Sequence, residues 1–235
     1  MRRTLVAIGV ITAVLSTSTA IASLHTPNLP GPSDWANRIN NKWFPLLPGT
    51  VFTYAGKKDG KTGRDVLTVT HLHRTIEGAP ATIIYDRLYL AGYLAERTTD
   101  WYAQDKQGNV WYLGESTATL NAQGKVLSTE GSWLAGVEGA RAGIYMPAHP
   151  TPSTQGLQEY YLAGHAADQY KVLSLHAHAS TPAASTSHAL LTQETGMFEP
   201  GVLDHKLYIA GVGDVVEQSI KPGNETFTLV SVRHR

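Results

Sequence analysis

Residues 100–115, DWYAQDKQGNVWYLGE, place two aromatic segments on either side of a polar turn. Trp-Tyr pairs at 101–102 and 111–112 mirror each other about that turn. Aromatic side chains that face each other across two strands fix the register of a β-hairpin, and Gly108 or Asn109 supplies the positive φ that a tight turn needs. The stretch therefore predicts an antiparallel hairpin.

The same strand chemistry continues on both sides of this hairpin. Short turns separate runs rich in Val, Ile, Thr, Tyr and Trp, and no stretch shows apolar residues at helical spacing. We therefore expect an all-β, single-domain antiparallel meander with little helix, curved into a lipocalin-like barrel or a clam-like half-barrel. The predicted strands are 49–54, 65–73, 81–88, 93–105, 109–117, 125–133, 157–162, 169–178, 187–194, 205–210, 214–220 and 226–232.

The chain divides into three expected parts. Residues 1–22 combine a short basic start, an apolar run and a small-x-small motif, which is the pattern of a secretory signal peptide. Residues 23–42 are rich in Pro, Asn and Ser and predict an extended arm, and residues 43–235 form the β domain with a long loop over 136–156. We expect a secreted or periplasmic protein, with an uncleaved membrane anchor as the alternative.

Charge, cysteine content and missing motifs narrow the classes of partner. The full chain has 19 Lys and Arg against 19 Asp and Glu, and no Cys. The basic residues are scattered, so we expect no nucleic-acid partner and no membrane partner after signal cleavage. Without disulfides, stability must come from packing and hydrogen bonds. No phosphate loop, dinucleotide fingerprint or nucleophile elbow occurs, and we expect no cofactor.

Four segments carry a resemblance to other proteins. They have the patterns DWYAQD…GNVWYxGE at 100–115, GSWxAGVxGA at 131–140, QEYY at 158–161 and KxYxxGVG at 206–213. Together they resemble a family of exported bacterial proteins of uncharacterised function, and the similarity covers nearly the whole mature chain, from residue 43 to residue 217. The resemblance implies export and brings no activity, cofactor or partner with it.

One face of the strand at 93–105 is polar throughout. Alternation places Glu96, Thr98, Asp100, Tyr102 and Gln104 on that face. On a flat sheet such a face is solvated, whereas on the concave side of a curved sheet it becomes a ligand-binding wall. The leading hypothesis is an exported protein that binds an amphiphilic or apolar small molecule, with the 136–156 loop over the mouth. Its candidate ligand-binding residues are Glu96, Asp100, Tyr102, Gln104, Trp111, Tyr161 and Tyr208.

Carboxylates in several strands support a second hypothesis, an extracytoplasmic hydrolase or lyase. Two carboxyl groups with different environments can serve as general acid and general base. The competing interpretation, which we prefer, is that these groups form structural ion pairs with Arg87, Arg97 or Lys206. A third hypothesis is a structural or interaction module without a site. The candidate catalytic residues are Asp100, Glu159, Glu194 and His205.

Two His-x-His pairs, at 71–73 and 176–178, each place two imidazoles on one face of a strand. A simple antiparallel register sets His188 opposite His176, which gives a candidate zinc or copper ligand set of His176, His178 and His188. Because the chain has ten histidines, chance pairs are common. We interpret these side chains as solvated and predict no metal site.

Overall fold

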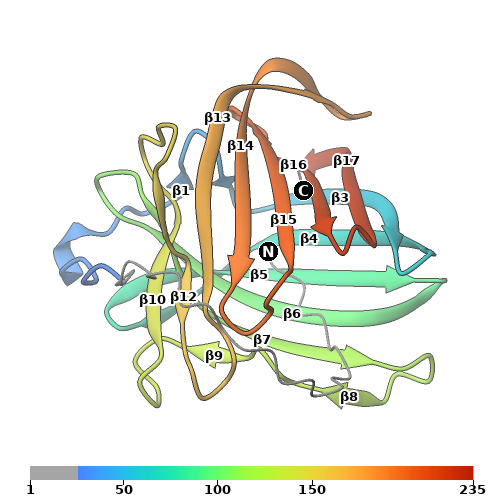
Figure 1. The fold of residues 1–235 in the computed structure, drawn as a ribbon. Coiled ribbons are helices and arrows are strands. Elements are labelled where there is room, and N and C mark those ends of the chain that lie inside the picture. The colour runs from blue at the N-terminus through green and yellow to red at the C-terminus, as the bar shows by residue number, and fades with distance from the viewer. Residues whose placement is uncertain (1–25, 235) are drawn as a thin grey trace, which may run out of the picture.

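The computed structural model of the chain describes residues 26–234, so the predicted signal peptide lies outside the described residues. The described part forms one short 3-10 helix and 17 β-strands (Figure 1). The helix and the first strands are η1 (Pro32–Asp34), β1 (Ile39–Asn40), β2 (Pro45–Leu46), β3 (Thr50–Lys58), β4 (Lys61–Ile76), β5 (Ala79–Leu90), β6 (Tyr93–Gln104), β7 (Val110–Leu120) and β8 (Val126–Ser128). The other strands are β9 (Trp133–Leu134), β10 (Arg141–Met146), β11 (Gln155–Leu157), β12 (Glu159–Tyr160), β13 (Asp168–Ser180), β14 (Ser185–Gly196), β15 (Leu203–Ile209), β16 (Gly213–Lys221) and β17 (Glu225–His234).

Fifteen of these strands form one antiparallel sheet that curves into a nearly closed barrel. The main path runs β11-β13-β14-β15-β16-β17-β3-β4-β5-β6-β7-β10-β12, with β8 and β9 on β7. Figure 1 shows β13–β15 crossing in front of β4–β7, as expected for a strongly bent sheet. The predicted antiparallel meander curved into a barrel is confirmed. Within residues 26–234 no helix has the length and apolar character needed to span a membrane.

The hairpin at 100–115 forms as predicted, with one irregularity. Tyr102 lies opposite Tyr112, and Gly108 in the turn has a φ of 96°. A bulge after this pair sets Trp101 opposite Gly114, whose φ is 140°. Because the bulge shifts the register by one residue, Asp100 and Glu115 lie directly opposite each other.

A short segment joins the two ends of the sheet. Its first half, β11, pairs with β13, while its second half, β12, pairs with β10 at the other end of the path. Between them, the backbone N–H of Gln158 donates to the carbonyl of Asp168 at 2.8 Å. Residues 155–160 therefore act as the seam of the barrel.

The structure differs from the predicted loop at 136–156, because residues 141–146 form strand β10 against β7. The glycine content of the segment suggested irregular backbone, but Gly143 lies within a strand that packs closely against a neighbouring segment. A Cβ at this position would lie 2.1 Å from the carbonyl oxygen of Leu157 in the seam. The seam can approach β10 only because Gly143 has no side chain.

The end of the predicted arm and the residues that follow it pack into the barrel. Trp35 and Ile39 of the arm are buried. Phe44, in the predicted β domain, is also buried, and its ring centroid lies 5.5 Å from that of Tyr102 and 4.6 Å from that of Tyr145. The predicted arm thus contributes Trp35 and Ile39 to the hydrophobic core.

Candidate functional site

The polar face of β6 points into the barrel. Glu96, Thr98, Asp100 and Tyr102 are buried, whereas the intervening Arg97 is exposed. Neighbouring strands add further inward polar groups in register with this row: Asp86 lies opposite Thr98, and Thr98 lies opposite Thr117, with the two hydroxyl oxygens 2.8 Å apart. The curved sheet therefore places a band of carboxyl and hydroxyl groups in its interior.

Asp100 lies at the centre of this band and is 1% exposed. The Tyr112 hydroxyl donates to its Oδ1 at 2.8 Å, and within residues 26–234 its Oδ2 has no hydrogen-bond partner. Burial raises the pKa of Asp100 to about 7, against the hydrogen bond from Tyr112, which lowers it. Asp100 is thus an acid that exchanges its proton near neutral pH.

Glu115 faces Asp100 across the hairpin. Burial raises the pKa of Glu115 well above its usual value, and the charges of Glu159 and Asp100 push it in the same direction. Like charges placed opposite each other in a sheet repel, so these carboxyl groups hold protons more tightly than isolated ones. Asp100, Glu115 and Glu159 form one acidic cluster, which we call the inner acidic cluster.

Two tyrosines pack beside the inner acidic cluster. The rings of Tyr102 and Tyr112 stack with centroids 4.6 Å apart and an interplanar angle of 12°. Tyr145 packs its edge against both rings. The Tyr102 hydroxyl is fully buried and has no hydrogen-bond partner in the described part of the chain.

A buried lysine, Lys206, lies on the other side of the barrel interior. Lys206 Nζ lies 2.9 Å from Glu194 Oε2 and 4.0 Å from Glu217 Oε1, and it donates to the Tyr145 hydroxyl at 3.3 Å. Burial lowers the pKa of Lys206, but Glu194 and Glu217 more than offset this, so the net pKa is raised and the ammonium stays charged. The preferred interpretation of Glu194, a structural ion pair with Lys206, is confirmed.

A third carboxyl group with a raised pKa, that of Asp214, lies near this ion pair. Burial raises the pKa of Asp214 to about 8, although Lys206 acts in the opposite sense. Asp214 Oδ1 has no hydrogen-bond partner within residues 26–234. A cavity of about 20 Å³, large enough for one water molecule, adjoins this group. Its lining residues are Phe44, Tyr54, Asp65, Leu67, Asp214, Glu217 and Phe227.

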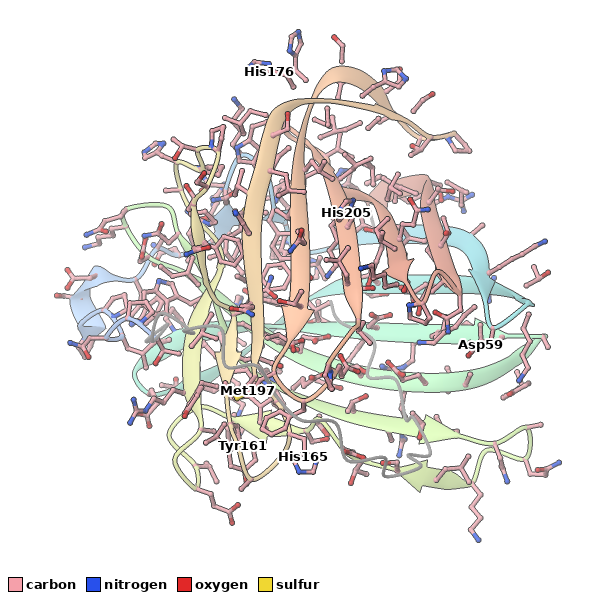
Figure 2. All side chains as sticks on the ribbon, viewed as in Figure 1. Asp59, Tyr161, His165, His176, Met197 and His205 are labelled. Atoms are coloured by element: carbon pink, nitrogen blue, oxygen red, sulfur yellow. The ribbon has the colours of Figure 1, made fainter. Side chains whose placement is uncertain are left out.

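A surface groove of about 300 Å³ leads toward the inner acidic cluster. Glu115 belongs to both, since it lines the groove and faces Asp100. The groove is lined by Trp101, Glu115, Ser132, Trp133, Leu134, Val137, Glu138 and Tyr161. Tyr161, labelled near the lower end of the barrel in Figure 2, is the one predicted ligand-binding residue found in this groove.

The other predicted site residues divide between interior and exterior. Tyr208 is buried beside Glu194, to which its hydroxyl donates at 3.5 Å. Gln104 is buried but is used structurally, because its amide bonds reciprocally with Asn40 of the arm. Trp111 lies on the opposite face from Tyr112, under the ring of Trp35, and its Nε1 donates to Asp105 at 2.8 Å.

His205 does not join the carboxylates that it was grouped with. On β15, Lys206 and Tyr208 point inward, so alternation turns His205 to the outer face, where it is half-buried. Burial lowers its pKa. The interior instead gains Glu115, which the sequence reasoning missed. The register shift between Trp101 and Tyr102 sets Glu115 opposite Asp100, and regular strand alternation gave no signal of this pairing.

Of the three candidate metal-ligating histidines, the structure brings two together. His176 and His188 meet with their Nδ1 atoms 3.3 Å apart, but no group of three potential metal ligands occurs within residues 26–234. In the other His-x-His pair, His73 Nδ1 lies 3.5 Å from Thr82 Oγ1.

Comparisons with known proteins add no assignment: no family model, no curated protein and no solved structure matches this chain. The resemblance to exported bacterial proteins stays a prediction.

Proposed function

We propose that this chain is an exported protein that binds a small amphiphilic molecule in the surface groove of about 300 Å³ that Glu115 lines. The barrel interior, which was expected to hold the ligand, is packed: Asp100 is 1% exposed, and the cavity of about 20 Å³ described above has room for one water molecule. The observation that carries the proposal is the lining of the groove, which combines the aromatic residues Trp101, Trp133 and Tyr161 with the carboxyl group of Glu115.

The chemistry of the lining favours one class of ligand. Burial raises the pKa of Glu115, so its carboxyl group keeps a proton to higher pH and can both donate and accept a hydrogen bond. The rings of Trp101, Trp133 and Tyr161 favour an apolar body. We therefore propose an amphiphile with a hydroxyl-rich end that binds at Glu115 in the groove.

Native mass spectrometry of the protein purified from its own host tests this proposal. We expect a co-purifying small molecule at one copy per chain, lost or bound at least about tenfold more weakly in Glu115→Leu, since a polar ligand end left without its partner costs about 1–3 kcal/mol. His205→Ala, on the outer face of the same barrel, is the matched control and should retain it. Apo protein from the host, with no small molecule in any preparation, would contradict the proposal.

The facing pair Asp100 and Glu115 favours a second candidate function, a hydrolase or lyase that uses paired carboxylates. Directly opposite residues in an antiparallel pair have Cβ atoms about 5 Å apart, which brings two carboxyl groups into the range that acid and nucleophile or base require. Asp100, with a pKa near 7, is suited to the role of general acid. Loss of polysaccharide- or ester-cleaving activity in both Asp100→Asn and Glu115→Gln, with ligand occupancy unchanged, would favour this candidate over binding alone.

A further inference from the structure

His176 and His188 form an exposed imidazole pair on the hairpin of β13 and β14. Their Nδ1 atoms lie 3.3 Å apart, and the rings are nearly perpendicular, with centroids 5.6 Å apart. Figure 2 labels His176 at the top of the view, near the bend of this hairpin and away from His205. The pair is thus separate from the site proposed above.

In both strands, the backbone N–H of the histidine donates to a hydroxyl group two residues earlier. The backbone N–H of His176 donates to Ser174 Oγ at 3.0 Å, and that of His188 donates to Thr186 Oγ1 at 3.1 Å. The strand register shifts on both sides of the Ala177–Ala189 pair. Such bulges re-aim side chains, and here they bring two imidazoles together instead of alternating them along a regular ladder.

We propose that His176 and His188 together bind a divalent transition-metal ion, with Zn²⁺ as the best fit. In a tetrahedral zinc site with Zn–N bonds of about 2.0–2.1 Å, two ligand nitrogens lie about 3.3–3.4 Å apart. The Nδ1 separation of 3.3 Å is therefore the edge of a zinc tetrahedron. Water completes the coordination, because no third ligand group occurs within residues 26–234.

A simple imidazole–imidazole hydrogen bond is the competing explanation of the same distance. The two explanations differ in what added metal does. A bound ion would link β13 to β14 beyond the barrel and stabilise the hairpin, whereas a hydrogen bond predicts no response to metal.

Isothermal titration calorimetry with ZnCl₂ on the metal-free full chain tests the proposal. We expect one Zn²⁺ per chain, and an affinity at least about tenfold weaker in His176→Ala and in His188→Ala. His71→Ala on β4 and His178→Ala on β13 are matched histidine controls and should stay within about twofold of the wild type. Visible absorption of added Co²⁺ provides a second readout, because four-coordinate Co²⁺ absorbs far more strongly than the hydrated ion.

Loss of Zn²⁺ affinity in both His176→Ala and His188→Ala supports the site, if the wild type also shows a four-coordinate Co²⁺ spectrum that both variants lack. Equal Zn²⁺ affinity in wild type, His176→Ala and His188→Ala overturns it, as does the absence of Zn²⁺ binding. An equal loss in His178→Ala would overturn the two-histidine assignment. Circular dichroism of each variant establishes that these exposed substitutions leave the fold intact.

Discussion

At the scale of single residues, the barrel interior contains two different arrangements of buried ionisable groups. Lys206 is matched by Glu194 at 2.9 Å, and this pair is well packed and hydrogen-bonded. In the inner acidic cluster, burial and neighbouring carboxyl groups keep Asp100 and Glu115 protonated to higher pH. Attraction to Glu194 offsets the cost of burying the Lys206 charge, whereas ionisation of the acidic cluster adds repulsion between like charges.

Asp100 gives a pH-dependent prediction. Its folded pKa, about 7, lies above its ordinary value, so its favourable contribution is full below about pH 4 and is lost as pH rises toward 7. Asp100→Asn stays neutral and can still accept from Tyr112. We expect its free energy of unfolding, relative to wild type, to increase by about 2–4 kcal/mol between pH 4 and pH 8.

Urea unfolding across that pH range measures the difference. Asp65 and Glu96 also act on Asp100, so the comparison between variant and wild type isolates the one group better than either curve alone. The exposed Asp34→Asn serves as control and should run parallel to wild type. Parallel curves for Asp100→Asn as well would show that the buried acid does not titrate in this range.

At the scale of elements, the seam decides whether the barrel closes. Residues 155–160 pair with β13 on one side and β10 on the other, and the approach to β10 depends on Gly143. We expect Gly143→Val to destabilise the protein by about 2–4 kcal/mol, because the added side chain meets backbone that cannot move aside.

Thermal unfolding followed by near-ultraviolet circular dichroism, which reports the packed tyrosines and tryptophans, checks this. Gly156→Ala is the matched control in the same seam, since its Cβ would meet only the Tyr170 ring, at 3.3 Å. The control should cost less than about 1 kcal/mol. Equal stability of Gly143→Val and wild type would mean that the seam is not tightly packed in solution.

The strands also show what the sequence could reveal. Strand alternation and aromatic pairing are local, so they predicted the 100–115 hairpin and the shared face of Glu96, Asp100 and Tyr102; that this face points inward follows from the curvature of the whole sheet. Strand β10 was missed because its glycine content is explained by contact with a distant segment. The sequence identified Lys206 as a candidate partner of Glu194. That His205 points outward depends on which residues of β15 face the interior, and the sequence pattern did not establish this.

At the scale of the whole molecule, the order of the sheet ties the chain ends together. The last strand, β17, lies between β16 and β3, so the first and last long strands are neighbours (Figure 1). Ring closure of this kind is non-local and leaves no periodic signal in the sequence. It also means that neither half of the chain can complete its own hydrogen bonding, because β3 needs β17 and the seam links β10 to β13.

This arrangement predicts that the barrel folds as one cooperative unit. Truncation after Gly223 removes β17, exposes the edges of β3 and β16, and deletes the fully buried Phe227 and Leu229. Losing two such side chains costs about 5 kcal/mol or more, comparable to the whole stability of a domain. We therefore expect no cooperative unfolding transition and a tendency to aggregate through the exposed edges.

Insertion of two glycines between Pro182 and Ala183, at the exposed tip of the β13–β14 hairpin, is the control. It should cost less than about 1 kcal/mol, because lengthening a surface loop adds little closure entropy. A truncated chain that still unfolds cooperatively, with coincident near- and far-ultraviolet transitions, would show that the sheet is stable as an open meander and that ring closure is not what holds the interior carboxylates in place.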